Sequence, residues 1–465
     1  MYKSVDREIL DELVAIVGED GVIVDAEGLE PYTHDETVGL QADPEVVVKV
    51  QDAQQIAQIM KLASRERIPV VPRAGGQGLS GGSVATCGGI ILSVERMNRV
   101  LEIDTDNLMV TVEPGVITGD LRRAVEAEGL FYPPDPASID SCCIGGNLAE
   151  GAGGPGAVKY GTTKDYVCGL EAVLPSGDIV QMGGKLVKNV TGYRLMDLLV
   201  GSEGTLAIVT KIIFRLLPLP QLRVDLLVPY DDFRAAAQTV SDIIRLRVVP
   251  TALEFMERDI VQACEAVTEE KAPYRDAAAQ LLITIDGNHQ DQIDADMETV
   301  AETCLDNGAI DVLVARDRPT SDRLWKARRL IIEAINNACP VNHMEDVVVP
   351  RSRIPELLEG IQEIAQTHSV RIWNFGHAGD GNVHVTLMKD ELDDEAWETI
   401  VPPAREAIYR LTLSLGGQLT AEHGIGATRR GYLPLAVGEA QVQLMRGIKQ
   451  TFDPHNILNP AKILP

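Results

Sequence analysis

Three of the chain's eight histidines fall in two glycine-bordered segments near the C-terminus, where their spacing could support catalysis. His377 and His384 stand seven positions apart in GHAGDGNVH, and His423 stands in AEHGIG. Imidazole is a common metal ligand and a base near neutral pH, so these residues could hold a metal or accept a proton. They are therefore the first candidates for an active site.

A tight polar turn is predicted between the first two of these histidines. Residues 378–382 are small or polar, and we expect a strand ending near Phe375 before them and a strand starting at Val383 after them. Both imidazoles can then converge on one point, where a carboxylate would complete a three-ligand metal site with an open position; Glu422 is the candidate. No regular helix forces the two histidines together, unlike in H-E-x-x-H, so the residues alone leave a structural role open.

Two glycine-rich segments indicate a ligand that approaches the backbone closely. Residues 73–89 and 145–161 hold seven glycines each, together 14 of the 41 in the chain. Within the first, GQGLSG at 76–81 matches G-x-G-x-x-G, but a strand-like run follows where a nicotinamide dinucleotide fold needs a helix. Small residues let successive N–H groups form an anion-binding nest without a helix, which favours a bound diphosphate. A turn without a ligand is the alternative, and it would leave the second segment unexplained.

Short β-branched runs and amphipathic helices surround these segments. Residues 40–115 are expected to form an α+β unit in which the first glycine loop joins two strands. After the LPLPQ break at 217–221, residues 223–314 follow the order βαββαβ of a ferredoxin-like unit, whose sheet could cover a ligand held by the first domain. Strands are expected at 46–50, 68–72, 89–94 and 109–112, and further helices at 4–17, 53–67, 320–336, 351–368, 395–414 and 438–451.

The composition excludes several classes of function. The 465 residues carry a net charge of −27, which would repel nucleic acid and anionic membranes, and no basic patch is evident. The longest apolar runs fall far short of the ~20 residues that cross a bilayer, and the first residues lack the apolar stretch of a signal peptide. We therefore expect a cytoplasmic protein. Its seven cysteines form no C-x-x-C pair, so neither an iron-sulfur relay nor a four-thiolate zinc site is predicted.

Eight motifs follow one another along nearly the whole chain, namely VVPRAGGQGLSGG, TVEPGV, FYPPDP, IGGNLAEGAGGPGAVKYG, KNVTGYRLMDLLVGSEGTLAIVT, NFGHAGDGNVH, AEHGIG and NILNP. As a set they resemble FAD-linked oxidases of the vanillyl-alcohol oxidase type, and among them glycolate oxidase catalytic subunits and bacterial D-lactate dehydrogenases. The resemblance implies an α+β fold with a two-subdomain FAD-binding domain at 1–217 and a ferredoxin-like α+β cap domain at 218–415. A C-terminal helical segment at 416–465 would return to the FAD and the active site.

The resemblance also implies which residues hold the cofactor. The first glycine loop holds the FAD diphosphate in that family, a role that falls here to Gly75, Gly76, Gln77, Gly78 and Ser80. The second segment lies along the ribityl chain and the flavin, and the matching residues are Pro134, Asp135, Ser141, Gly145, Asn147 and Gly153. Ile208 and Asn459 match positions near the flavin or the adenine. Many relatives attach the flavin to a histidine of the first loop; Gln77 stands at that position here, so we expect non-covalent FAD.

The histidine cluster acquires roles from the same resemblance. In similar D-2-hydroxy-acid dehydrogenases the H-x-G-D-G-N-x-H turn and the glutamate of A-E-H-G bind a divalent metal. This assigns zinc, iron or manganese to His377, His384 and Glu422, and the role of base to His423. A metal on the substrate hydroxyl lowers its pKa while the imidazole takes the proton, and the Cα hydrogen leaves as a hydride to the flavin.

The substrate carboxylate needs a cation. The resemblance assigns this role to Arg328 in LWKARR, the position where similar dehydrogenases keep a carboxylate-binding arginine, whereas Lys326 and Arg329 could equally form a solvated helix face. Asn382 is expected to donate a hydrogen bond to substrate or flavin, and Asp380 to form the turn. Relatives that use larger diacids carry an extra basic residue that aligns here with His343 or Met344. A small monocarboxylate such as D-lactate or glycolate is therefore the expected substrate.

Reduced flavin needs an acceptor outside this chain, because the cysteines cannot hold an iron-sulfur relay. The resemblance offers an iron-sulfur subunit, an electron-transferring flavoprotein or a quinone-like small molecule, with membrane association only through such a partner. A homodimer is left open. The alternative function is a non-catalytic, flavin-binding electron-transfer subunit, which the complete set of three histidines and a glutamate argues against.

Overall fold

The computed structural model describes residues 2–465, which form two compact units. Unit 1 consists of Met1–Ala152, Thr162–Leu219 and Glu422–Pro465, and unit 2 of Gly153–Gly161 and Pro220–Ala421. Both units combine helices with sheets, which confirms the α+β class. The domain boundaries expected after residues 217 and 415 lie two and six residues before those of the structure, at 219 and 421.

Unit 1 begins with a four-stranded sheet in the order β1-β2-β4-β3, in which β2 and β3 both pair parallel with β4. Its strands are β1 (Val22–Ile23), β2 (Val46–Lys49), β3 (Val70–Arg73) and β4 (Ile90–Ser93). Helices α1 (Arg7–Val17) and α3 (Ala53–Glu66) begin at the aspartate caps Asp6 and Asp52 and bury their apolar stripes in one core with this sheet. The three strands predicted here are confirmed, and the first glycine loop joins β3 to β4 as predicted.

A second, antiparallel sheet of unit 1 has the order β5-β6-β10-β8-β9. Its strands are β5 (Val100–Asp104), β6 (Met109–Val112), β8 (Val167–Val173), β9 (Ile179–Gly183) and β10 (Ile208–Arg215). Of these, the sequence predicted β6 alone. Shorter elements complete this part of the unit: α2 (Ala26–Leu29), α4 (Thr118–Glu126), β7 (Leu130–Phe131), α5 (Ile144–Glu150), α7 (Met196–Leu199) and β11 (Leu217–Pro218).

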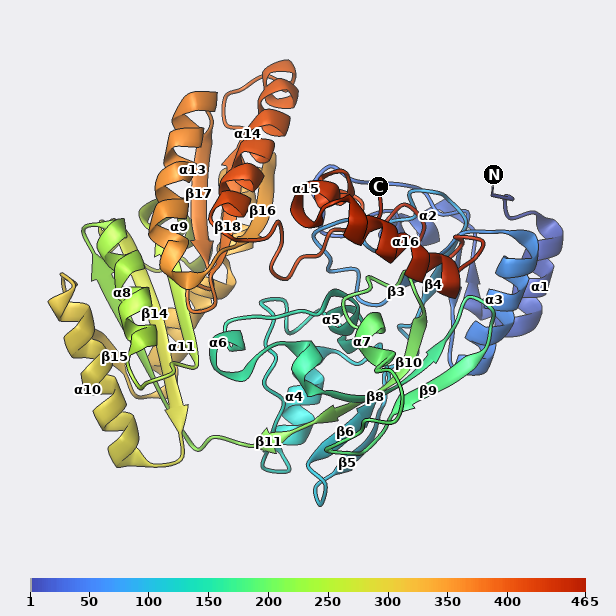
Figure 1. The fold of residues 1–465 in the computed structure, drawn as a ribbon, viewed down its shortest axis with the longest axis horizontal. Coiled ribbons are helices and arrows are strands. Elements are labelled where there is room, and N and C mark those ends of the chain that lie inside the picture. Colours follow the sequence, from blue (N-terminus) through green and yellow to red (C-terminus); the bar gives the residue numbers. More distant parts are fainter. Residues whose placement is uncertain (1) are drawn as a thin grey trace. The chain divides into compact units, whose positions relative to one another are not determined.

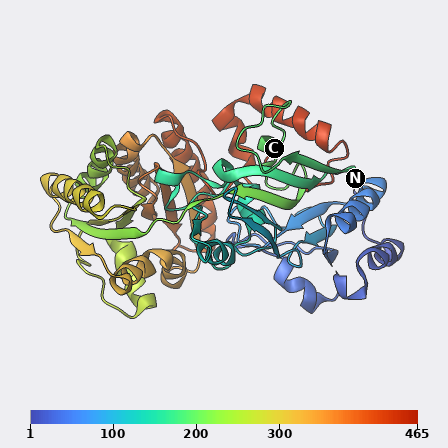
Figure 2. The ribbon, with the colours of Figure 1, turned by 90° about the horizontal axis from the view of Figure 1, so that it is seen from below.

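The C-terminal segment also belongs to unit 1. It contains α15 (Leu433–Val437) and α16 (Glu439–Phe452), and Leu458 forms a parallel bridge with Val70 of β3. At the other end of the chain, the Tyr2 hydroxyl donates to the carbonyl of Asn456 at 2.7 Å. Accordingly, the red C-terminal helices lie with blue and green elements of unit 1 in Figures 1 and 2.

Unit 2 is built on a seven-stranded antiparallel sheet in the order β15-β12-β14-β13-β17-β18-β16. Its elements are β12 (Leu222–Tyr230), α8 (Phe233–Arg245), β13 (Ala252–Glu257), α9 (Arg258–Thr268), β14 (Ala279–Gly287), α10 (Gln290–Asp306), β15 (Leu313–Ala315), β16 (Asn342–Val348), β17 (Arg371–Gly376) and β18 (Asn382–Met388). The first four strands, with α8 and α10, confirm the predicted βαββαβ order. Helix α9 interrupts it and was not predicted, and the last three strands extend the sheet.

Helices cover both faces of this sheet. Successive residues of β14 and β18, whose side chains point to opposite faces, are accordingly buried. One group consists of α8, α10, α13 (Ile354–His368) and α14 (Asp394–Ser414), and the other of α9, α11 (Arg318–Arg329) and α12 (Ile331–Ala338). The second group packs Trp325 and Ile331 against Trp373 and Phe375 of β17. The single helix predicted at 320–336 is therefore two helices. None of the helices between residues 2 and 465 has the length and apolar character to cross a membrane.

Residues 153–161, expected in the FAD-binding domain, belong instead to unit 2. They contain α6 (Ala157–Tyr160). Lys159 donates to the carbonyl of Asp286 at 2.9 Å, and the Tyr160 hydroxyl donates to both carboxylate oxygens of Asp286 at 3.0 Å. These contacts fix the segment to β14, so Gly153 lies in a different unit from the other predicted cofactor residues.

Candidate functional site

The two histidines of GHAGDGNVH lie at a hairpin turn of unit 2. Strands β17 and β18 pair antiparallel with Phe375 opposite His384, and residues 377–381 connect them. Gly381 has φ +95°, and a Cβ there would lie 2.1 Å from the carbonyl oxygen of Val349. The turn therefore needs glycine at this position, both for its backbone conformation and for the close approach of β16's end.

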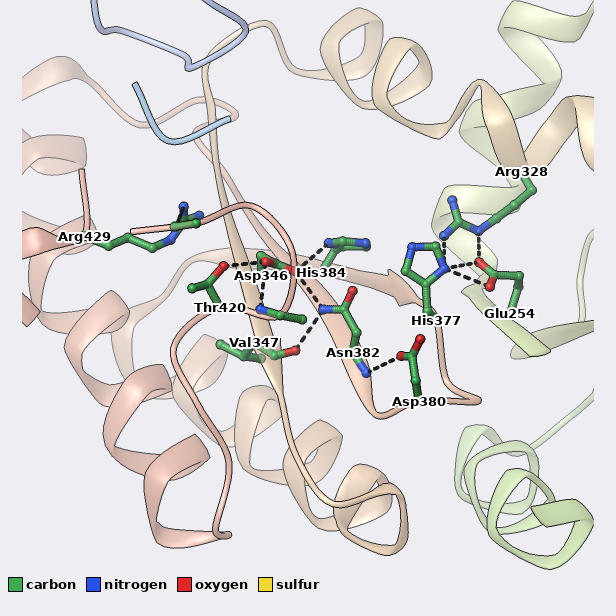
Figure 3. A network of polar contacts seen from close by, with 12 residues as sticks. Glu254, Arg328, Asp346, Val347, His377, Asp380, Asn382, His384, Thr420 and Arg429 are labelled. Carbon is green, nitrogen blue, oxygen red and sulfur yellow. Dashed lines mark hydrogen bonds and ion pairs between the residues drawn. The ribbon is translucent and has the colours of Figure 1, made fainter. Parts of the chain in front are cut away.

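Strand register adds an aspartate to this site that the sequence analysis missed. Asp346 of β16 pairs directly with His384 of β18, so their side chains share one face of the sheet. Oδ1 of Asp346 lies 3.5 Å from Nδ1 of His384, and both residues are buried. Figure 3 shows the two side chains facing each other. The sequence analysis considered His343 and Met344 of the same strand, but not this residue.

Glu254 of β13 orients His377, the other histidine of the turn. Its two carboxylate oxygens lie 2.8 and 3.0 Å from Nδ1 of His377. A carboxylate on one ring nitrogen leaves the other, Nε2, for a metal and makes it a stronger ligand. The ring centroids of His377 and His384 are 5.5 Å apart. Two imidazoles on one tetrahedral zinc, with Zn–N bonds of about 2.0 Å, would place their centroids about 5 Å apart. The pair therefore has the spacing of two ligands of one ion.

The same glutamate holds Arg328. Nε of Arg328 donates to Oε2 of Glu254 at 2.6 Å, and Nη2 lies 3.5 Å from Nδ1 of His377. The guanidinium is buried and lies over the ring of Phe375, 5.3 Å from its centroid. Burial opposes the ionisation of Glu254, but the charges of Arg328 and His377 outweigh it and hold the pKa of that carboxyl below its usual value. A buried cation thus lies beside a histidine of metal-ligand type (Figure 3).

Asn382 differs from its predicted role as a donor to substrate or flavin. Its Nδ2 donates to Oδ1 of Asp346 at 2.7 Å and to the carbonyl of Val347 at 3.1 Å, so both amide hydrogens are used within unit 2. Asn382 therefore orients Asp346. Its Oδ1 is buried and has no hydrogen-bond partner among residues 2–465, which leaves an acceptor at this point. The backbone N–H of Asn382 donates to Oδ1 of Asp380 at 3.3 Å, which closes the turn.

Asp346 also anchors the segment that leads to the third histidine. Its Oδ2 accepts a hydrogen bond from the Thr420 hydroxyl at 2.7 Å and another from the N–H of Ala421 at 3.0 Å. Glu422 and His423 are the next two residues, with consecutive Cα atoms about 3.8 Å apart. Chain continuity therefore ties the A-E-H-G motif to Asp346. Asp346, His384, Glu422 and His423 each offer a ligand atom of the kind that holds a metal ion, whereas the predicted ligand His377 is not in this group.

The first glycine loop of unit 1 presents unused backbone donors. The N–H groups from Gly75 to Ser80 have no hydrogen-bond acceptor among residues 2–465, whereas Gly81 donates to Oγ1 of Thr37 at 2.7 Å. The buried Oγ of Ser80 likewise has no partner in that part of the chain. Successive N–H groups in a glycine-rich loop can bind phosphate, so the loop fits the diphosphate of FAD. These groups belong to the predicted residues Gly75, Gly76, Gln77, Gly78 and Ser80.

The first glycine loop contacts Ser141, four residues before the second glycine segment. Its hydroxyl donates to Oε1 of Gln77 at 2.9 Å, and a Cβ on Gly75 would lie 3.0 Å from the Ser141 carbonyl oxygen. In the first turn of α5, a Cβ on Gly145 would lie 2.6 Å from the Cβ of Pro114. Close approach of backbone to backbone therefore explains why both segments consist of small residues.

The other predicted cofactor residues are distributed over several elements. Asn147 is buried in α5, and Ile208 lies in the core of the first sheet. Asn459 donates from Nδ2 to the carbonyls of Gly82 and Glu203 at 2.9 and 2.7 Å, and its buried Oδ1 has no partner in the described chain. Pro134 and Asp135 lie in the coil after β7, and Gly153 lies in unit 2.

Comparisons with known proteins bear on this architecture. Residues 44–183 match the FAD binding domain family, and residues 219–463 match the family described as FAD linked oxidases, C-terminal domain. Glycolate oxidase subunit GlcD of Bacillus subtilis is 40% identical, covering 99% of this chain and 97% of its own. D-lactate dehydrogenase of Anaerostipes hadrus is 36% identical, covering 99% and 98%.

A solved structure shares the fold at low identity. p-Cresol methylhydroxylase with substrate bound superposes with a TM-score of 0.82 at 18% identity, covering 100% of this chain and 98% of its own. The fold is thus of the vanillyl-alcohol oxidase type, as the motifs implied. Two domain matches and 40% identity along nearly the whole length show that the chain belongs to the FAD-linked oxidases and is an FAD-linked oxidoreductase.

Proposed function

We propose that this oxidoreductase oxidises a small D-2-hydroxy acid, D-lactate or glycolate, to the 2-keto acid. The observation that carries the proposal is the buried triad of Glu254, Arg328 and His377, in which one carboxylate orients a cation and a metal-type imidazole. A 2-hydroxy acid carries a carboxylate next to a hydroxyl, and these two groups would take the cation and the metal. The names of two relatives, a glycolate oxidase subunit and a D-lactate dehydrogenase, support this substrate class.

A divalent metal is proposed on His377, His384 and Glu422, with Asp346 orienting His384. Nε2 of His377 is the ligand atom, because Nδ1 faces Glu254. Two imidazoles and a carboxylate are the donor set of catalytic sites that keep an open position, and zinc, iron and manganese accept such ligands. When bound, the ion would lower the pKa of the substrate hydroxyl.

His423 is proposed to take the hydroxyl proton, because imidazole is the side chain suited to accept a proton near neutral pH. It is the residue next to the proposed ligand Glu422. Arg328 would hold the substrate carboxylate and so orient the Cα–H bond. Bound FAD supplies the oxidant, which accepts the Cα hydrogen as a hydride. Oδ1 of Asn382 would accept a hydrogen bond in the loaded site.

The face of β16 that carries Asp346 favours a small acid. His343 and Glu345 share the opposite face, and Nε2 of His343 lies 2.8 Å from Oε1 of Glu345. The neighbour of Asp346 on its own face is Met344, which is apolar. A second carboxylate of a larger diacid would find no cation at this position of the strand, so a monocarboxylate is proposed.

FAD is proposed to bind without a covalent link, because Gln77 stands where many relatives attach their flavin to histidine. Oε1 of Gln77 accepts a hydrogen bond from the Ser141 hydroxyl, so this side chain contacts the stretch that precedes the second glycine segment. The electron acceptor is proposed to be an electron-transferring flavoprotein or an iron-sulfur subunit. The relative named as a glycolate oxidase subunit supports an assembly of more than one chain.

Anaerobic reduction of the protein-bound flavin by a panel of hydroxy acids tests the proposal. D-lactate or glycolate should bleach the visible flavin absorption fastest, whereas L-lactate and D-2-hydroxyglutarate should react far more slowly. The non-catalytic alternative predicts no bleaching by any acid. A colourless protein that takes up no FAD, or a flavin that no hydroxy acid reduces, would refute the proposal.

A further inference from the structure

Two carboxylates of unit 1 lie against the loop that follows His423. Oε1 of Glu203 accepts the backbone N–H of Ile425 at 2.8 Å, and Oε2 accepts that of Gly426 at 2.7 Å. A Cβ on Gly424 would lie 2.3 Å from Oε2 of Glu150 and 2.9 Å from Oε1 of Glu203. Both carboxyl groups therefore touch the residue next to His423, and one of them holds the two residues after it.

The backbone of Glu203 has an unusual conformation that is fixed by hydrogen bonds on both sides of the residue. Glu203 has φ +51°, in the left-handed region that non-glycine residues rarely adopt. Its N–H donates to the carbonyl of Ala149 at 2.8 Å, and its carbonyl accepts Nδ2 of Asn459 at 2.7 Å. The side chain is buried. A strained backbone of this kind is kept where many surrounding contacts fix it. In this conformation the carboxylate of Glu203 accepts hydrogen bonds from two N–H groups of the loop.

The loop is fixed from other sides as well. Nη1 of Arg429 donates to the carbonyl of Gly424 at 3.2 Å. The N–H groups of Ala427 and Thr428 donate to the carbonyl of Ser80 at 2.8 and 3.3 Å. At the other end of the motif, the N–H of Ala421 donates to Asp346. The span from Glu422 to Gly424 is thus held on both sides, and Glu203 supplies the tether on the C-terminal side.

The hydrogen bonds of Glu203 favour its ionised form more than the surroundings of Glu150 do. Two N–H groups donate to its two oxygens, and a carboxylate is the stronger acceptor for both. Burial raises the pKa of Glu150 well above its usual range, and Glu203 and Asp35 add to this against the opposing charge of Arg429. Burial raises the pKa of Glu203 to about 7, against the two N–H bonds and the charges of Arg429 and Lys462.

We propose that Glu203 is a positioning residue for His423, acting through the N–H groups of Ile425 and Gly426. The inference rests on the proposed function in so far as His423 is the base. Loss of one of the two carboxylate oxygens as an acceptor would allow the backbone at Ile425 and Gly426, and with it His423, to move. Because small displacements of a catalytic group cost roughly 10–100-fold in rate, the loss should appear in the chemical step. Substrate binding, which we assign to Arg328, should stay unchanged.

The test compares Glu203→Gln with Glu203→Asp and a matched control. Glutamine keeps one acceptor but turns an NH2 group toward a backbone N–H, whereas aspartate keeps the charge and is one methylene shorter. Glu171→Gln is the control, because Glu171 belongs to the same unit and accepts from Thr210 and Lys211 but from no residue of the loop. All variants are prepared with FAD, and bound flavin, melting temperature and anaerobic reduction by D-lactate are measured.

For Glu203→Gln we expect full FAD content, an unchanged substrate dissociation constant and a limiting reduction rate lowered roughly 10–100-fold. Glu203→Asp should recover part of that rate, and Glu171→Gln should match the wild type. Amide hydrogen exchange of Ile425 and Gly426 should accelerate in Glu203→Gln, a readout that does not depend on turnover.

Three outcomes would overturn the inference. The first is a wild-type reduction rate in Glu203→Gln with its flavin bound, and the second is unchanged amide exchange at Ile425 and Gly426. The third is loss of FAD or of folding in both Glu203 variants, which would make Glu203 a structural residue of unit 1. A wild type that no hydroxy acid reduces would instead refute the proposed function, while the exchange experiment would still decide whether Glu203 holds the loop.

Discussion

Replacing Glu254 with glutamine tests the buried triad of unit 2 most directly. The change keeps the shape of the side chain but removes the charge that Arg328 and His377 share at 2.6 and 2.8 Å. Removing one partner of a buried ion pair leaves the other charge unpaired, which costs about 3–5 kcal/mol. Because Glu254 is 0% exposed, solvent offers little compensation. We expect Glu254→Gln to lower the free energy of unfolding by about that amount, measured by urea denaturation at neutral pH.

Loss of the carboxylate should also weaken the proposed metal site. His377 would lose the acceptor at Nδ1 that fixes its ring and strengthens Nε2 as a ligand. Changes of this kind typically lower metal affinity roughly 10–100-fold. Titration of the metal-free protein with zinc or manganese measures this directly, without any need for turnover.

The stability deficit of Glu254→Gln should depend on pH. The pKa of Glu254 lies below its usual value near 4.5 because Arg328 and His377 outweigh the effect of burial. A carboxyl with a lowered pKa stabilises the fold fully above its unfolded-state pKa and loses that contribution as the pH falls through its folded-state pKa. The difference in unfolding free energy between wild type and variant should therefore be constant above about pH 5 and shrink below about pH 4.

Glu257→Gln provides the matched control on the same strand. Glu257 is partly buried and accepts from the N–H and Nδ2 of Asn374, both at 3.1 Å, but it forms no ion pair within residues 2–465. We expect its loss to cost much less at neutral pH than the loss of Glu254. Equal stability of wild type and Glu254→Gln, together with equal metal affinity, would refute the reasoning that one carboxylate organises this group.

The remaining predictions concern the reaction and the neighbouring acids. His423→Asn should keep its FAD but slow flavin reduction by D-lactate roughly 10²–10⁴-fold, measured by anaerobic stopped flow; a normal rate would exclude it as the base. A strong chelator should abolish flavin reduction without releasing FAD, and added zinc or manganese should restore it; an unaffected chelated enzyme would leave the two-histidine turn purely structural. Asp346→Asn should lower metal affinity roughly 10–100-fold by loosening His384, again read by titration. Burial raises the pKa of Glu257 from its usual value near 4.5 to about 7, so the wild type loses stability as the pH rises between these two values. The stability of Glu257→Gln relative to wild type should therefore rise from about pH 4.5 to about pH 7 and level off above that, measured in denaturation curves.

The order of elements in unit 2 was predictable because local signals agree with the fold. Strand β14 is rich in apolar and β-branched residues, and α8 begins at the cap Asp232 with a clear apolar stripe. Helix α9 escaped prediction because Glu257 ends β13 and Arg258 begins the helix with no turn residue between them. Strand β8 was not predicted either, because it contains Gly169, a residue that usually interrupts a strand pattern.

Only those parts of the site that lie within one sequence motif were predictable. The hairpin between His377 and His384 follows from a polar turn flanked by apolar runs, and the structure has it there. Asp346 and Glu254 lie beside these histidines because strands far apart in the sequence pair in this register, which no local pattern encodes. The same register places Asp346 beside Asn382, whose Nδ2 donates to it, a contact that the sequence did not predict.

Tyr2 and Pro465 both belong to unit 1, so unit 2 is an insertion made of two separate stretches of chain. Asp286 of the long stretch takes its partners Lys159 and Tyr160 from the short one. An exchange of this module with that of a relative, for instance to change acid preference, must therefore transplant Gly153–Gly161 together with Pro220–Ala421. A graft of the long stretch alone would pair one protein's carboxylate with another protein's lysine and tyrosine.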